Sequence, residues 1–264
     1  MDYLNTVLLG VIEGITEFLP ISSTGHLLIA EHWLGERSET FNVVIQAGAI
    51  LAVTVIYWRR IVELALDWHD PLNRSYAAKL IVAFLITAVL GFLAKKLGFT
   101  LPESIAPVAW ALIIGGFWIL AVEWYVARKA AIPYVSWPTA VVVGFAQIVA
   151  GVFPGTSRSG ATIFAAMLTG TTDRAAATEF AFLVGIPTMY AASGYELFKA
   201  LKEGGAANED WTALGIAFVV STVTAFIAVK WLLGYIQTHR FTVFAIYRIL
   251  LGAGLLAALA YGVL

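Results

Sequence analysis

The sequence contains no cysteine and unusually little charge. Without cysteine, the chain has no disulfides, no thiolate metal ligands and no cysteine nucleophile. Charged residues make up 12% of its 264 residues, whereas soluble domains carry about 25%. Because much of a soluble protein's exterior must face water, this composition excludes an ordinary soluble domain. The formal net charge of −1 provides no basic surface, so we expect no nucleic-acid partner.

Apolar residues take the place of charge: they form 60% of the chain, and the mean hydropathy is +0.85. A helix needs about 20 apolar residues to cross a hydrocarbon core of about 30 Å. Six stretches meet this requirement, so we predict an all-α, polytopic membrane protein surrounded by membrane lipid. The predicted spans are residues 41–58, 77–97, 105–127, 178–198, 211–235 and 241–263. Polar breaks lie at 67–75, 98–103, 128–138 and 199–210.

Two further apolar regions, residues 3–34 and 137–169, are interrupted near their middle. Pro20 and a Ser-Ser-Thr-Gly-His run break the first region, and Pro154 with a Gly-Thr-Ser-Arg-Ser-Gly run breaks the second. Each half is too short to span a membrane alone. Non-helical backbone at membrane depth persists only where it is buried in protein or lines a polar cavity. We therefore predict two re-entrant helical hairpins.

The two interrupted regions resemble each other at a constant offset of 134 positions. Three predicted spans follow each region, and because three is odd, the second half would enter the membrane in the opposite sense. Inverted repeats place their broken helices at the midplane, where the binding site forms, so we expect the two hairpin tips to meet. We predict one membrane domain, 1–264, with repeat halves of about 1–130 and 131–264. The matched pairs are Gly10 with Gly144, Glu13 with Gln147, Pro20 with Pro154, and Ser23 with Ser157.

Glu13 and Glu17 lie four positions apart, so they share one face of a helical segment. A carboxylate at bilayer depth costs about 2.5–3.5 kcal/mol, and two like charges side by side cost more. A divalent cation, Mg²⁺ or Ca²⁺, would offset this cost, since hard cations prefer carboxylate oxygens. The alternatives are that one carboxyl is protonated, or that both lie in the headgroup region.

The run from Ser22 to His26 precedes a new helical segment. A serine here would cap that helix, and the helix N-terminus would attract an anion. His26 falls in the first turn near Ser23, so the two side chains are candidates for a nucleophile and its base, or His26 attacks directly. The alternative is a plain helix cap with a structural histidine.

The run of glycines and hydroxyl residues at 154–162 is a more specific signal for phosphate. Glycines let backbone N–H groups approach a ligand closely, and hydroxyls add donors. Arg158 provides a rigid fork that matches phosphate oxygens. The alternative is a salt bridge from Arg158 that merely neutralises the acidic pair. The hydroxyl residues beside Arg158 are Ser157, Ser159 and Thr162.

Other charged residues bear on orientation and packing. Lys and Arg near the loops number nine on the side opposite the N-terminus and five on the N-terminal side. The positive-inside rule therefore places the N-terminal side outside the cytoplasm. Glu123 and Arg248 fall within predicted spans, where we expect each to form a structural ion pair or to snorkel.

The chain resembles the bacitracin-resistance type of undecaprenyl-diphosphate phosphatase in stretches spread through nearly its whole length. They are GVIEGITEFLPISSTGHLLI (10–29), FNVVIQAGAILAV (41–53), FPGTSRSGATI (153–163), EFAFLVGIP (179–187) and FAIYR (244–248). The resemblance implies an inner-membrane enzyme that hydrolyses undecaprenyl diphosphate, a C55 isoprenoid lipid diphosphate, to undecaprenyl phosphate. That product re-enters the lipid-carrier cycle of peptidoglycan synthesis, and the activity gives resistance to bacitracin.

The resemblance and the residue patterns together define a predicted site that opens toward the periplasm. A transporter or flippase for a phosphorylated isoprenoid lipid is the main alternative, since inverted repeats with broken helices are typical of transporters. The oligomeric state, including a homodimer, is left open. The predicted catalytic residues are Ser23, His26 and Glu17; the predicted metal ligands are Glu13 and Glu17; the predicted diphosphate-binding residues are Ser157, Arg158, Ser159 and Thr162.

Overall fold

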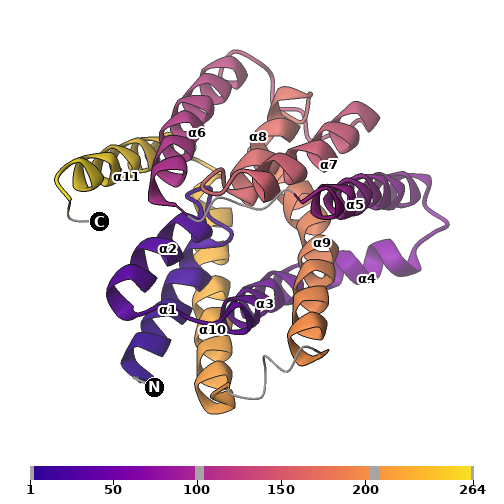
Figure 1. The fold of residues 1–264 in the computed structure, drawn as a ribbon. Coiled ribbons are helices and arrows are strands. Elements are labelled where there is room, and N and C mark those ends of the chain that lie inside the picture. Colours follow the sequence, from indigo (N-terminus) through magenta and orange to yellow (C-terminus); the bar gives the residue numbers. More distant parts are fainter. Residues whose placement is uncertain (1–2, 99–103, 203–208, 263–264) are drawn as a thin grey trace.

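The computed structural model describes residues 3–98, 104–202 and 209–262. Within these ranges the chain forms eleven α-helices and no strand, which confirms the all-α prediction (Figure 1). The helices are α1 (Tyr3–Thr16), α2 (Ser23–Leu34), α3 (Glu39–Ile56), α4 (Trp58–Leu66), α5 (Pro71–Lys96), α6 (Ile105–Val126), α7 (Trp137–Val152), α8 (Arg158–Leu168), α9 (Arg174–Lys202), α10 (Trp211–Tyr235) and α11 (Thr242–Ala260).

Six of the described helices are long and apolar enough to cross a membrane: α3, α5, α6, α9, α10 and α11. They match the six predicted spans, so the protein is a multi-pass membrane protein. The largest difference is at α5, which begins at Pro71, because proline suits the first helical position and Asp70 accepts a hydrogen bond from the backbone N–H of Leu72. The break predicted at 67–75 therefore shortens to residues 67–70. Parts of the predicted breaks at 98–103 and 199–210 lie outside the described residues.

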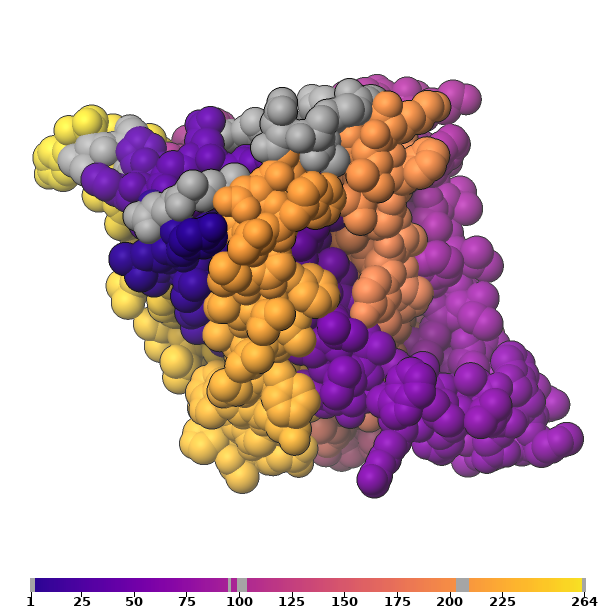
Figure 2. All heavy atoms as spheres, turned by 90° about the horizontal axis from the view of Figure 1, so that it is seen from below, coloured from indigo at the N-terminus to yellow at the C-terminus, as the bar shows by residue number. Residues whose placement is uncertain are grey.

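The outer faces of these helices carry large apolar side chains. On α10, Val219, Val223, Ile227 and Trp231 recur every four residues and are each more than half exposed. Figure 2 shows one side of α10, in orange, beside the indigo of α1. Residues four apart share one helical face, so this face is an apolar stripe of the kind that contacts lipid.

The two interrupted regions each form a helix, a turn and a second helix. We call the turns the first tip (residues 17–22) and the second tip (residues 153–157). At the end of each tip a serine adopts a positive φ, 75° at Ser22 and 71° at Ser157. Each of these serines caps the next helix by accepting the backbone N–H three residues later, from Gly25 and Gly160. The cap of α2 is therefore Ser22, and the conformational counterpart of Ser157 is Ser22 rather than the predicted Ser23.

Close helix contacts relate the two halves reciprocally. A Cβ on Gly10 of α1 would lie 2.9 Å from the carbonyl oxygen of Ala217 on α10. A Cβ on Gly144 of α7 would lie 2.9 Å from the carbonyl oxygen of Ala83 on α5. Both residues of the second contact differ by 134 positions from their counterparts in the first, the offset seen in the sequence.

The pair α6–α11, side by side at the upper left of Figure 1, is reciprocal as well. A Cβ on Gly116 would lie 2.8 Å from the carbonyl oxygen of Ala245, and a Cβ on Gly252 would lie 2.6 Å from that of Ala109. These paired contacts support a repeat. Whether the halves cross the membrane in opposite senses, and whether the interrupted regions are re-entrant, stay predictions.

Candidate functional site

The first tip contacts the start of α8, which directly follows the second tip, although the two segments are far apart in the sequence. The Ser159 hydroxyl, one residue into α8, donates to the carbonyl oxygen of Leu19 in the first tip at 3.0 Å. A Cβ on Gly160 would lie 3.4 Å from the Cβ of Pro20. The expectation that the two tips meet is therefore met.

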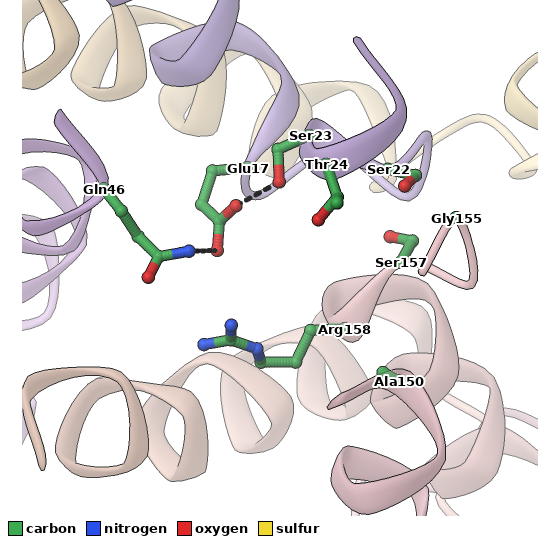
Figure 3. Close-up of a pocket in the computed structure, with 9 residues that line it drawn as sticks. All are labelled: Glu17, Ser22, Ser23, Thr24, Gln46, Ala150, Gly155, Ser157 and Arg158. Atoms are coloured by element: carbon green, nitrogen blue, oxygen red, sulfur yellow. Dashed lines mark hydrogen bonds between the residues drawn. The ribbon is translucent and has the colours of Figure 1, made fainter. Parts of the chain in front are cut away.

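A small polar pocket of about 40 Å³ lies between the tips and α3 (Figure 3). Side chains from both halves of the chain face it, so neither half contains the site alone. The lining residues are Glu17, Ser22, Ser23, Thr24, Gln46, Ala150, Gly155, Ser157 and Arg158.

Glu17 is the centre of the hydrogen bonding in this pocket. The Ser23 hydroxyl donates to Oε2 of the Glu17 carboxylate, and the Gln46 amide approaches Oε1 at 3.5 Å. Ser193 of α9 in turn lies 3.5 Å from the Gln46 carbonyl oxygen. Sequence reasoning missed Gln46; the available signal was an amide in the middle of a largely apolar predicted span.

Glu13 lies one turn before Glu17 on α1 and is buried, 1% exposed. Its Oε2 has no hydrogen-bond partner within the described part of the chain. Nowhere in that part do three or more His, Cys, Asp or Glu residues gather as a metal site. The two carboxylates still fit a hard cation, because a carboxylate oxygen without a donor is a free ligand, and Mg²⁺ commonly takes one or two carboxylates plus phosphate and water oxygens.

Arg158 projects from the N-terminal end of α8 toward Glu17 and Gln46 (Figure 3). No described carboxylate lies within 4.0 Å of its guanidinium, so the predicted alternative of a closed salt bridge to the acidic pair is not formed. Helices α2 and α8 both begin at this pocket, and their N-termini add partial positive charge. The pocket therefore combines a free guanidinium with donors suited to an anion.

His26 is hydrogen-bonded away from Ser23. Its Nδ1 lies 2.7 Å from the carbonyl oxygen of Ser22, and its Nε2 lies 2.6 Å from the hydroxyl of Tyr247 on α11. A carbonyl can only accept, so Nδ1 carries a proton, and in the neutral ring Nε2 accepts from the tyrosine. The predicted Ser23–His26 pair is not joined by a hydrogen bond, and the Glu17 carboxylate takes the place of the imidazole beside Ser23.

Ser159 and Thr162 are buried and do not line the pocket. Ser159 bonds to Leu19 and to the Ser157 hydroxyl, and the Thr162 hydroxyl donates to the carbonyl oxygen of Arg158 at 2.8 Å. Of the predicted diphosphate-binding residues, the structure therefore brings Ser157 and Arg158 to the pocket. For Ser159 and Thr162 that role stays a prediction.

Glu123 and Arg248 have different surroundings. Glu123 forms the expected ion pair, with Arg174 at the start of α9, and also accepts the backbone N–H of Phe241 before α11. For Arg248 the expectation was wrong: it neither pairs with a described carboxylate nor snorkels, and its side chain is buried among backbone carbonyls. Desolvation of the whole guanidinium is tolerated because carbonyl oxygens take up its N–H groups.

These features define a class: a multi-pass helical membrane protein with a small polar pocket between two interrupted helical regions. Comparison with known proteins makes the assignment specific. Residues 6–254 match the family described as "Bacitracin resistance protein BacA", and the chain belongs to this family.

Relatives with the name undecaprenyl-diphosphatase match the full chain. One from Rhizobium leguminosarum bv. trifolii (strain WSM2304) is 73% identical over 265 residues, covering 100% of both chains. One from Rhizobium johnstonii (strain DSM 114642 / LMG 32736 / 3841) is 72% identical over 264 residues, again covering 100% of both. A more distant one, from Xanthomonas euvesicatoria pv. vesicatoria (strain 85-10), is 58% identical over 255 residues, covering 97% of this chain and 96% of the relative.

Proposed function

We propose that the protein is an integral membrane undecaprenyl-diphosphatase, which hydrolyses undecaprenyl diphosphate to undecaprenyl phosphate and inorganic phosphate. The relatives' name, undecaprenyl-diphosphatase, and the family's link to bacitracin resistance support this activity. In this role the enzyme returns the lipid carrier to peptidoglycan synthesis. We place it in the bacterial inner membrane with the pocket open toward the periplasm, as the distribution of Lys and Arg supports.

The observation that carries the proposal is the Ser23 hydroxyl bonded to Glu17, facing Arg158 across the same pocket. Ser23 Oγ attacks the terminal phosphorus while its proton passes to the Glu17 carboxylate. The bond from that phosphorus to the bridging oxygen breaks, and undecaprenyl phosphate leaves with the electron pair. Water then hydrolyses the phosphoserine and releases inorganic phosphate.

Charge on the transferring phosphoryl group is stabilised by groups already in place. Arg158 offers a bidentate fork, and the N-termini of α2 and α8 offer backbone N–H groups. Because these donors are held by the fold, they need little rearrangement as the charge develops.

Glu13 and Glu17 are the residues that would hold a divalent cation, Mg²⁺ or Ca²⁺. The unpartnered Oε2 of Glu13 supports this assignment. When bound, the cation supplies Lewis-acid neutralisation of diphosphate oxygens. In this mechanism His26 is a positioning residue: its Nδ1–H donates to the carbonyl oxygen of Ser22 and holds the end of the first tip.

A transporter or flippase of a phosphorylated isoprenoid lipid is the competing function. It needs the anion site of Arg158 but not a hydroxyl held on a carboxylate. The pairing of Ser23 with Glu17 therefore favours hydrolysis.

Phosphate release by the purified protein from undecaprenyl diphosphate tests the proposal. We expect release by the wild type that EDTA abolishes and Mg²⁺ or Ca²⁺ restores. We expect losses of at least about 100-fold in Glu17→Gln, which removes the acceptor of the Ser23 proton, and in Arg158→Ala, which removes charge stabilisation. Arg128→Ala, an exposed arginine over the ring of Trp124, is the matched control and should retain activity. No release by the wild type would refute the enzyme, and full activity in both site variants would refute the site.

A further inference from the structure

Arg248 on α11 is 1% exposed, and it is among the largest fully buried side chains of the described structure. All three guanidinium nitrogens donate to backbone carbonyl oxygens, five in total, at distances from 2.9 to 3.3 Å. An arginine has five N–H donors, so each donor has one carbonyl. No described carboxylate lies within 4.0 Å of it.

The five carbonyls come from three separate segments. Nε and one Nη2 bond reach α6, at Leu112 and Ala111. Nη1 reaches Pro20 in the first tip at 3.2 Å. The second tip accepts two further bonds, from Nη1 to Thr156 at 3.0 Å and from Nη2 to Gly155 at 2.9 Å. One planar group therefore joins both tips to α6.

The chain around Arg248 leaves room for this arrangement. A Cβ on Gly115 of α6 would lie 2.7 Å from the Arg248 Cζ, closer than a real side chain could approach. The carbonyl oxygens of Pro20, Gly155 and Thr156 lie in turns, where no helical N–H is in place to donate to them, so without the guanidinium they would be buried without donors. Among the described residues, one hydrogen bond joins the two interrupted regions directly, from the Ser159 hydroxyl to the carbonyl oxygen of Leu19.

We propose that Arg248 is a positioning residue for the phosphatase reaction: it holds the two tips in register so that Ser23 and Glu17 on one side face Arg158 on the other. The proposal rests on the proposed function. Arg248 does not line the polar pocket, so it acts through the backbone of the tips and not on the substrate.

Steady-state kinetics of Arg248→Lys and Arg248→Met test the proposal. Lysine keeps the positive charge but has three donors at one point, so it cannot reach three segments at once. Because a misplacement of about 1 Å in a site can cost about 100-fold in rate, we expect kcat to fall by about that factor in both variants, while KM changes by less than about fivefold. A kcat for Arg248→Lys within twofold of the wild type would overturn the proposal.

Arg174→Lys is the matched control, since Arg174 is also a hydrogen-bonded arginine on a candidate membrane-spanning helix but contacts Glu123 and neither tip. We expect this variant to keep kcat within about threefold of the wild type. An equal loss in Arg174→Lys and Arg248→Lys would show that the effect is general destabilisation, and would overturn the positioning role.

A second test needs no substrate and no purified enzyme. The chain has no cysteine, so Pro20→Cys with Gly160→Cys introduces a single pair whose Cβ atoms lie close to the separation of a disulfide. In isolated membranes we expect oxidation to cross-link this pair rapidly, and at least about fivefold more slowly once Arg248→Met is added. Equal cross-linking rates with and without Arg248, or no cross-link when Arg248 is present, would overturn the positioning role of Arg248. If cross-linking behaves as expected while the wild type releases no phosphate, the proposed function is refuted, but the role of Arg248 in holding the two tips together is not.

Discussion

Gly252 and Gly254 of α11 lie two residues apart and should respond oppositely to alanine. A Cβ on Gly252 would lie 2.6 Å from the carbonyl oxygen of Ala109 and 2.7 Å from Cγ1 of Ile113. Backbone of α6 cannot move aside cheaply, so Gly252→Ala should cost about 1–3 kcal/mol through overpacking. A Cβ on Gly254 meets nothing within 4 Å. Gly254→Ala should therefore stabilise the helix by about 0.5–1 kcal/mol.

The two variants should differ by about 1.5–4 kcal/mol in stability. For a chain of this size 1 kcal/mol corresponds to roughly 2–4 °C in the unfolding midpoint. We expect Gly252→Ala to unfold at least about 3 °C below Gly254→Ala. The assay is thermal unfolding of the purified proteins in one detergent at one scan rate, since unfolding of such proteins is often irreversible and the midpoint then depends on the rate.

The reciprocal contact provides an internal check. Gly116→Ala would push a Cβ to 2.8 Å from the carbonyl oxygen of Ala245, so it should lower the midpoint about as much as Gly252→Ala. A Gly252→Ala protein as stable as the Gly254→Ala protein would refute the close packing of α6 on α11.

Three further predictions concern the site. Ser22→Gly should be more stable than Ser22→Ala by about 1 kcal/mol. Both variants lose the helix cap, but glycine adopts the positive φ without strain and alanine does not; equal thermal unfolding midpoints would contradict this. Gln46→Glu should lower kcat/KM by at least about tenfold more than Gln46→Met, because it adds a like charge beside Glu17, and the comparison of the two rates decides. Glu13→Gln should raise the Mg²⁺ concentration for half-maximal phosphate release by at least about tenfold, since it removes a charged ligand; an unchanged metal titration would exclude Glu13 as a ligand.

The membrane spans could be predicted from the sequence because length and hydropathy are properties of a segment by itself. The breaks at Pro20 and Pro154 could be predicted for the same reason, since proline and polar runs interrupt a helix locally. The short helix α4 was missed: it lies between two spans, and Arg59, Arg60 and Glu63 interrupt its apolar residues.

The partners of the polar side chains could be predicted less well, because they depend on tertiary structure. Two adjacent serines, Ser22 and Ser23, are equally good caps in sequence, and the positive φ that separates their roles arises from the turn. His26 was expected beside Ser23, but its ring stacks on Tyr247, which is 221 positions away. The carbonyl partners of Arg248 come from segments that only the fold brings together.

The reciprocal glycine contacts have a consequence for how the protein is assembled. They join α1 to α10, α5 to α7 and α6 to α11, so each half of the chain packs mainly on the other. Residues 1–130 synthesised alone would expose these glycine-containing helix faces to lipid, without the helices of the other half that pack against them. A gene cut in the 129–136 loop should still yield a working enzyme when both fragments are made in one cell, and neither fragment should be stable without its complement.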